Sequence, residues 1–210
     1  MFDSKPILDA LIENDKSKVL ELVQNALDQG VAAKEILNEG LIAGMDIVGE
    51  KMENEEMFIP EVLMAAKVMG AAVEILKPLL ADEDMSAMGK VVIGTVKGDL
   101  HDIGKNLVAM MLESAGFEVF NLGVDISPDN FIAEITEKDA QMLCLSALLT
   151  TTMPMMKQTI DAVTESGLRD RIKIMVGGAP VTKKFADEID ADGYAPDAGS
   201  ATKLAKLLLQ

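Results

Sequence analysis

The residues best suited to chemistry gather in short segments that follow apolar runs. The first segment, KGDLHDIG at residues 97–104, contains the single histidine of the chain, His101. A neutral imidazole is a common metal ligand, and its second ring nitrogen usually donates a hydrogen bond to a carboxylate that fixes the tautomer. Asp99, two residues earlier, is placed to accept that bond. Gly104 carries no side chain, which lets a bulky ligand approach the backbone.

This set of side chains limits the kind of metal site that is possible. One histidine with a few carboxylates is a poor set for a bare zinc ion, which normally needs about three or four protein ligands. The same histidine suffices where a macrocycle supplies the remaining donors. Spacing alone leaves a second interpretation open, in which His101 is an ordinary loop histidine and Asp99 caps a helix.

The segment lies in a half of the chain that alternates strands and helices. Short apolar or β-branched runs predict strands at residues 90–96, 118–122, 141–146 and 172–176, with a weaker strand near 192–194. Helical patterns follow them at 103–115, 128–138, 153–166, 181–188 and 201–209. The alternation indicates an α/β fold, a flavodoxin-like five-stranded parallel sheet in the order 2-1-3-4-5 with helices on both faces.

That strand order makes a spatial prediction. Strand order reverses between the first and third strands, so the loops after Val96 and Ser146 flank one crevice. Ligands of open α/β sheets bind there, beyond the carboxyl ends of the strands. We therefore expect the chemistry in residues 97–104 and 146–152, with residues 177–180 beside them.

The first 80 residues predict only helices. Apolar residues recur at helical spacing between Asp15 and Gly30, from about Ala32 to Glu53, and from Pro60 to Leu76, after a short N-terminal helix. They predict a four-helix bundle at residues 1–85, followed by the α/β domain at 86–210. The acidic segment 81–89 is the expected linker.

Composition narrows the possible partners. The formal net charge is −16, from 35 acidic and 19 basic residues, which disfavours nucleic acid and anionic membrane surfaces. We see no signal peptide and no apolar stretch near the roughly 20 residues of a membrane span. The single cysteine, Cys144, cannot form an internal disulfide, which fits a cytoplasmic location. Its place in an apolar strand predicts a buried, unreactive thiol.

Three motifs together resemble the cobalamin-binding domain of methionine synthase and its relatives. They are Asp99-x-His101-x-x-Gly104, Ser146-x-Leu148-x-Thr150 and Gly177-Gly178, each after a predicted strand. In the helical part, Gly44-Met45-Asp46-x-Val48-Gly49 and Phe58-Ile59-Pro60-Glu61 resemble the helical cap of that family. The resemblance covers essentially the whole chain and is nearest to the freestanding corrinoid proteins of methylamine, methanol and betaine methyltransferase systems in anaerobic microbes.

The resemblance implies a set of site residues. His101 is implied to be the lower axial ligand of cobalt, with Asp99 and Ser146 extending its hydrogen bond. The residues implied to bind the corrinoid (cobalamin or a relative) are Asp99, His101, Asp102, Ile103, Gly104, Ser146, Leu148, Thr150, Gly177, Gly178, Tyr194 and Ala198. Those implied to cover its upper face are Met45, Val48, Gly49 and Met52.

The residues themselves leave plainer roles open for several of these positions. Ser146 and Thr150 can cap the following helix, and Gly177-Gly178 can simply form a tight turn. The stripe of Met45, Val48 and Met52 can belong to the core of the bundle. The aromatic and polar cap residues of methionine synthase have no evident counterparts here.

The resemblance also implies a function in one-carbon metabolism. The corrinoid, cycling between cob(I)amide and methylcob(III)amide, is implied to carry a methyl group from a substrate-specific methyltransferase to an acceptor methyltransferase that acts on a thiol or tetrahydrofolate-type acceptor. A reductive activation protein is a further expected partner, and little activity is expected from this chain alone. His101 is expected to dissociate as cobalt is reduced, and the cap to move about a hinge near residues 81–89.

Two other functions stay open at this point. A cobalamin-binding subunit of a radical mutase has the same α/β domain but does not normally carry a four-helix cap. A cobalamin-sensing regulator can have a similar cap, but is expected to carry a DNA-binding module for which this chain has no spare segment.

Overall fold

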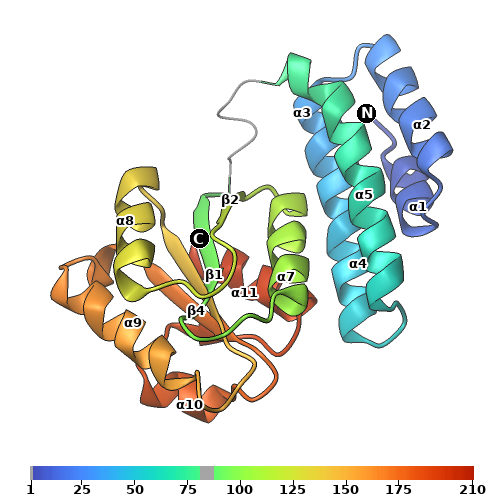
Figure 1. Ribbon diagram of the computed structural model, residues 1–210. Helices are drawn as coiled ribbons and strands as arrows, with labels where there is room; N and C mark the ends of the chain where they lie inside the picture. Colours follow the sequence, from blue (N-terminus) through green and yellow to red (C-terminus); the bar gives the residue numbers. More distant parts are fainter. Residues whose placement is uncertain (1, 81–87) are drawn as a thin grey trace. The chain divides into compact units, whose positions relative to one another are not determined.

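The computed structural model describes residues 2–80 and 88–210 (Figure 1). They form two compact units, one made by the N-terminal helices and one that contains a sheet. In these two ranges no helix is both long and apolar enough to cross a membrane. The predicted linker and hinge at 81–89 lie outside the described residues, apart from positions 88 and 89.

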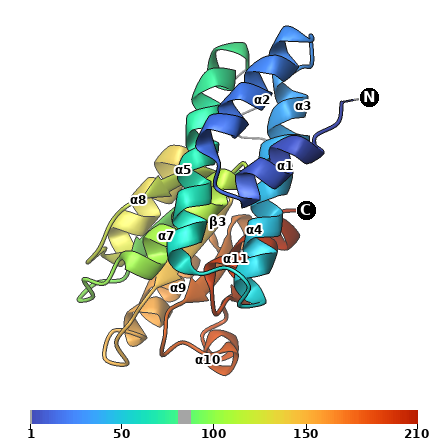
Figure 2. The same cartoon turned by 90° about the vertical axis from the view of Figure 1, so that its right-hand side faces the viewer.

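The N-terminal unit is the predicted bundle. Its main helices are α1 (Lys5–Ile12), α2 (Lys16–Asp28), α4 (Ala43–Glu53) and α5 (Ile59–Leu76). Helix α1 packs on α2 and α4, and α5 packs on α2 and α4 (Figure 2). The Asp15 carboxylate caps α2 by accepting the Lys18 amide at 3.0 Å, and Gly30 follows its end in the left-handed region at φ 82°.

The predicted helix from Ala32 to Glu53 is continuous but not uniformly α-helical. It comprises α3 (Ala33–Glu35), a π-helix (Ile36–Ile42) and α4. Two glycines of this run lie against α1: a Cβ at Gly40 would stand 3.3 Å from Ile7, and one at Gly44 would stand 2.7 Å from Leu11. A side chain at position 44 would require the end of the Leu11 side chain to shift.

The second unit is the predicted α/β sheet. Its parallel strands are β1 (Lys90–Thr95), β2 (Glu118–Asn121), β3 (Met142–Ser146), β4 (Lys173–Gly177) and β5 (Gly193–Tyr194). Their order is β2-β1-β3-β4-β5, which confirms the flavodoxin-like prediction. Thr95 pairs with Ser146, and Ser146 pairs with Gly177, so β1, β3 and β4 end at the same level.

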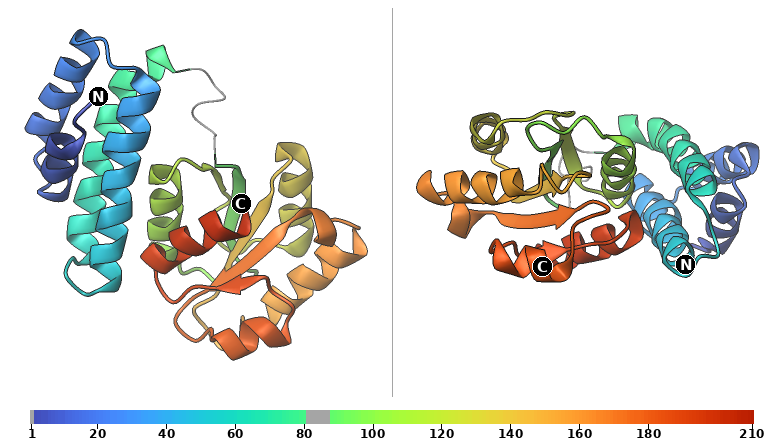
Figure 3. Two further views of the ribbon diagram at one scale, coloured as in Figure 1. Left: turned by 180° about the vertical axis from the view of Figure 1, so that it is seen from behind. Right: turned by 60° about the horizontal axis from the view of Figure 1, so that its bottom comes forward.

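Helices cover both faces of the sheet. One face packs on α8 (Pro128–Lys138), α9 (Pro154–Glu165) and α10 (Lys183–Glu188) through a cluster that includes Val92, Leu143 and Val176. Helices α7 (Ile103–Ser114) and α11 (Ala198–Leu208) lie on the opposite face (Figure 3). The predicted start of the last helix at Ala201 was wrong by three residues, because the Asp197 carboxylate accepts the Ser200 amide at 2.8 Å and caps α11 earlier.

Candidate functional site

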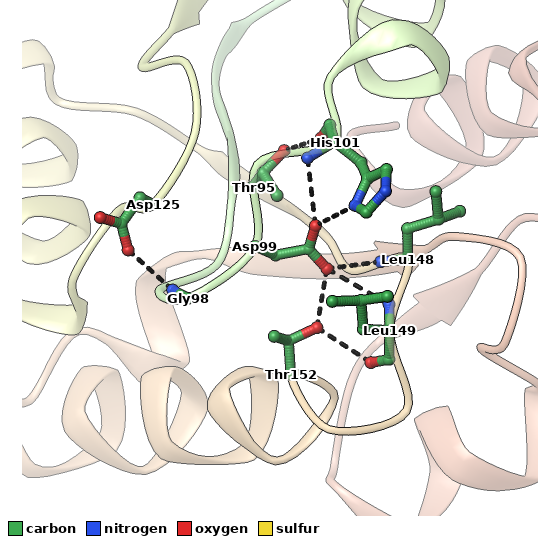
Figure 4. Close-up of polar contacts among 8 residues, drawn as sticks. All are labelled: Thr95, Gly98, Asp99, His101, Asp125, Leu148, Leu149 and Thr152. Carbon is green, nitrogen blue, oxygen red and sulfur yellow. Dashed lines mark hydrogen bonds and ion pairs between the residues drawn. The ribbon is translucent and has the colours of Figure 1, made fainter.

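Two loops from strands far apart in the sequence meet beside β1. The loop after β1 carries Asp99 and His101, and the loop after β3 carries Leu148 and Thr152. The Asp99 carboxylate joins them, because its Oδ2 accepts hydrogen bonds from the Leu148 amide at 2.8 Å and from the Thr152 hydroxyl at 2.7 Å (Figure 4). The predicted meeting of these loops at the reversal of strand order is therefore confirmed.

The other oxygen of Asp99 holds His101. The distance from Oδ1 to Nδ1 of the imidazole is 2.7 Å, and the His101 amide donates to the same oxygen at 3.1 Å. The carboxylate is fully buried, whereas the imidazole side chain is 50% exposed. An ionised carboxylate can only accept, so Nδ1 carries a proton, and in the neutral imidazole Nε2 then keeps its lone pair. In that form the contact with Asp99 selects one tautomer and leaves one ring nitrogen able to act as a donor atom.

The electrostatics of Asp99 favour this arrangement. Burial alone raises the pKa of a carboxyl group, but hydrogen bonds from Thr152, His101 and Leu148 outweigh burial here and hold the pKa of Asp99 well below its ordinary value. The carboxylate therefore stays ionised and keeps accepting the proton of Nδ1.

Thr152 lies at the end of the predicted segment 146–152, but the sequence reasoning gave it no role. Its hydroxyl contacts Asp99, the role assigned to Ser146. Ser146 ends β3, and its carbonyl accepts the Val96 amide at 3.0 Å. Thr152 reaches Asp99 because the chain folds back after Leu149, whose carbonyl accepts the Thr152 amide at 3.0 Å. Among the described residues, the hydroxyl on Asp99 is thus that of Thr152, and a role for Ser146 toward a ligand remains a prediction.

Four large apolar side chains in or next to the two loops that meet at Asp99 are exposed. Leu100 and Ile103 are 72% and 79% exposed, and Leu148 and Leu149 are 40% and 42% exposed. Exposed apolar side chains grouped in this way are typical of binding surfaces.

The remaining predicted residues of the first loop lie at the start of α7. The Asp102 side chain is exposed, and its Oδ2 accepts a hydrogen bond from Asn106 at 3.0 Å. At Gly104 an added Cβ would meet open space. The close approach of a ligand to Gly104 stays a prediction.

A second residue missed by the sequence reasoning is Lys105, which is 4% exposed. Its ammonium donates to Asn106 at 2.6 Å and to Asn121 at 2.5 Å, which ties the first turn of α7 to the end of β2. Burial lowers the pKa of Lys105. Its helical spacing from the apolar residues Ala109 and Leu112 was the available signal that this lysine faces the interior.

Gly177, the last residue of β4, and Gly178 both lie close to neighbouring backbone, which favours glycine at these positions. Gly178 has φ 130°, and a Cβ there would lie 1.9 Å from the Ala147 carbonyl oxygen. A Cβ at Gly177 would lie 3.1 Å from the Ala195 carbonyl oxygen. These contacts place the end of β4 against the segments that follow β3 and β5 and do not depend on a ligand, so a ligand-binding role remains a prediction.

The other predicted site residues lie on several elements. Tyr194 is half-buried in β5, and Ala198 is buried at the first position of α11. Thr150 is exposed in the loop after β3. In α4, Met45, Val48 and Gly49 are buried and Met52 is half-buried, so their part in covering a ligand stays a prediction.

Comparison with known proteins agrees with this geometry. Two family models, each described as a B12 binding domain, match residues 89–203 and 4–77. Dimethylamine corrinoid protein 3 of Methanosarcina acetivorans is 46% identical over 97% of this chain and 95% of its own length.

Two solved structures are similar in fold over nearly the whole chain. A cobalamin-binding protein from Desulfitobacterium hafniense superposes with a TM-score of 0.87 at 32% identity, covering 100% of both chains. A chain of the methanol:cobalamin methyltransferase complex from Methanosarcina barkeri superposes with a TM-score of 0.84 at 31% identity, covering 97% of this chain and 78% of that one.

Proposed function

This chain belongs to the corrinoid proteins with B12-binding domains, and we propose that His101 is the protein ligand of the corrinoid cobalt. The protein binds a corrinoid and carries a methyl group in a methyltransferase system, in partnership with a methyltransferase. The observation that supports the ligand proposal is the 2.7 Å contact between Nδ1 of half-exposed His101 and buried Asp99, which leaves Nε2 free.

The surroundings of His101 fit a corrinoid. Leu100, Ile103 and Leu148 offer a large macrocycle an apolar seat around a single nitrogen donor. The described residues contain no group of three or more His, Cys, Asp or Glu side chains that could hold a metal ion. One imidazole would be enough here, because a corrin ring brings its own nitrogen ligands for cobalt. When bound, the corrinoid supplies the cobalt that accepts and releases the methyl group.

The residues of the chain have a supporting part in this chemistry. Asp99 keeps the proton of His101 on Nδ1 and orients the ring, while Thr152 and the Leu148 amide keep Asp99 in place. An imidazole held in this way would be a more basic donor toward a bound metal than a free imidazole. The buried Asp99 carboxylate would thereby influence a bound metal through the orientation and basicity of His101.

The partners can be proposed more finely. We propose that a substrate-specific methyltransferase transfers a methyl group to this protein and that a second methyltransferase removes it. We further propose that a reductive activation protein returns inactive, oxidised cobalt to its active form. The relatives named dimethylamine corrinoid proteins make a methylated amine the first donor to test. The radical mutase and sensor alternatives gain no specific support from the site.

Isotope labelling of histidine tests the ligand directly. The chain has one histidine, so protein with ¹⁵N-histidine has labelled nitrogens only at His101. In the electron paramagnetic resonance spectrum of the cob(II) form, ¹⁴N coordination splits each cobalt line into a triplet and ¹⁵N into a doublet. We expect the change from triplet to doublet on labelling and its loss in His101→Ala. An unchanged triplet in the labelled protein would show that the nitrogen comes from the cofactor.

Methyl transfer tests the carrier function separately. Reduced, corrinoid-loaded protein is incubated with a candidate methyltransferase and a donor carrying a radiolabelled methyl group. We expect label on the protein in proportion to the bound corrinoid, and none when the partner enzyme is omitted. A tight preference for adenosylcobalamin, with no label from any donor enzyme, would instead favour the mutase alternative.

A further inference from the structure

A second carboxylate holds the loop that carries Asp99 and His101. Asp125 lies in the loop after β2, and its Oδ1 accepts the Gly98 amide at 2.7 Å. Its own amide donates to the Asp99 carbonyl at 3.0 Å. These two hydrogen bonds hold the Gly98 amide and the Asp99 carbonyl, on either side of the Asp99 side chain. Figure 4 shows the first of them.

The backbone at this point needs such a restraint. Gly98 lies in the left-handed region at φ 82°, and glycine has more conformational freedom than any other residue. Asp99 makes a further backbone bond, from its amide to the Val96 carbonyl, but that bond is longer at 3.2 Å. Without the Asp125 carboxylate, the Gly98 amide loses its acceptor, and the backbone that carries Asp99 and His101 gains conformational freedom at Gly98.

Asp125 is itself firmly placed. It has φ 58°, a conformation that aspartate and asparagine tolerate better than other side chains do. The next residue, Ile126, donates from its amide to the Thr95 carbonyl at 3.0 Å and forms a parallel bridge with Val96. Asp125 is therefore held, through Ile126, against the end of β1 and the start of the loop that carries Asp99.

We propose that Asp125 is a positioning residue for His101: it fixes the backbone of Asp99 and thereby the tautomer and direction of the imidazole. The significance for cobalt rests on the proposed role of His101, whereas the positioning itself is a property of the protein without its cofactor. Asp125 acts only through the loop, and none of its hydrogen bonds reaches the imidazole.

Three variants separate the carboxylate from the backbone conformation. Asp125→Gly keeps the positive φ and removes the acceptor of the Gly98 bond. Asp125→Asn tolerates the same φ and keeps an oxygen that accepts this bond, so it should restore wild-type behaviour. The matched control is Asp139→Gly, since Asp139 also has positive φ at 51° and an exposed side chain, but ends α8 and pairs with Arg171.

The first readout uses full-length protein without corrinoid. Because His101 is the only histidine, the ¹⁵N chemical shifts of ¹⁵N-histidine protein report its tautomer without assignment. We expect a fixed Nδ1–H tautomer in wild type, Asp125→Asn and Asp139→Gly, and averaged shifts in Asp125→Gly. For the second readout, the proteins are loaded with cob(II)alamin, and the fraction of bound cobalt whose signal shows histidine nitrogen splitting is measured. We expect this fraction to fall about 10-fold in Asp125→Gly.

Each outcome bears on the proposal. Wild-type tautomer and nitrogen splitting in Asp125→Gly would overturn it, and so would equal losses in Asp125→Gly and Asp139→Gly, which indicate general destabilisation. Failure of Asp125→Asn to restore the tautomer would also overturn it. If the tautomer changes as expected but wild-type protein shows no histidine splitting, the positioning stands and the assignment of His101 as cobalt ligand fails.

Discussion

The substitution Asp99→Asn tests the reasoning about the histidine tautomer, because an asparagine can keep only one of the two acceptor oxygens. In the wild-type site Oδ2 accepts from Leu148, Thr152 and, at 3.3 Å, the Leu149 amide, whereas Oδ1 accepts only from the amide and ring of His101. The remaining oxygen is expected at the Oδ2 position, where it satisfies more donors. The new NH₂ group then faces His101.

This orientation places two donors face to face, at the NH₂ group and at Nδ1–H of His101. The conflict is relieved if the imidazole proton moves to Nε2, so that Nδ1 accepts from the asparagine. Nε2 then has no lone pair for a metal. To coordinate, the ring must return to the opposed arrangement, which costs about 1–3 kcal/mol for a buried unsatisfied donor, or roughly 10-fold to 100-fold in ligand affinity.

Two measurements and one control variant test the predicted tautomer change and the loss of corrinoid affinity in Asp99→Asn. The ¹⁵N shifts of the single histidine should move from the Nδ1–H to the Nε2–H pattern, and corrinoid affinity measured by titration should fall by the stated factor. Asp129→Asn is the matched control, since it removes the same charge at an exposed position in α8, outside the predicted site residues. An Asp99→Asn protein that keeps both the Nδ1–H tautomer and wild-type affinity would refute the assignment of Asp99 as the residue that sets the tautomer.

Three further predictions follow from individual positions. Gly178→Ala should destabilise the protein by about 3 kcal/mol or more in urea unfolding, because the new Cβ overlaps the Ala147 carbonyl. The control Gly123→Ala, at φ 86° with open space around the new Cβ, should cost about 1–2 kcal/mol, and equal costs would contradict the overlap. Gly104→Ala should leave folding unchanged or stabilise it by up to about 1 kcal/mol, yet weaken corrinoid binding measured by calorimetry; unchanged binding would disprove the close approach of a ligand there. Burial raises the pKa of the Cys144 thiol to about 12, so native protein at pH 8 should not react with a chromogenic disulfide until urea is added, and rapid reaction in the native state would contradict that burial.

The parts of the fold set by local pattern were predictable. Apolar runs of strand length alternating with helical patterns led to the observed strand order, and the position of His101 followed from the rule for ligands of open sheets. The pairing of Asp99 with His101 was also accessible, because both residues belong to one short loop. The π-helix at Ile36–Ile42 was not predicted, since its apolar spacing resembles that of an α-helix.

Contacts that depend on the shape of a distant loop were not predictable. Ser146 was assigned as the partner of Asp99 because the motif Ser146-x-Leu148-x-Thr150 resembles that of the cobalamin-binding family. The structure uses Thr152, whose position depends on the turn that begins at Leu149. Asp125 was missed for the same reason, because it follows a different strand and meets Gly98 only after the sheet has formed. A spacing within one loop carries no information about such contacts.

The distribution of hydrogen bonds on Asp99 allows the imidazole ring of His101 to move while the carboxylate stays in place. Of its five hydrogen bonds, only one comes from the imidazole ring, and four come from the His101, Leu148 and Leu149 amides and the Thr152 hydroxyl. If the ring turns away, the carboxylate keeps these four partners and stays ionised in its place. The ring loses one charge-assisted hydrogen bond, worth about 1.5–3 kcal/mol, and regains water at its exposed side. The imidazole can therefore leave and return without rebuilding the site, and the resting position of Asp99 selects the Nδ1–H tautomer at every return.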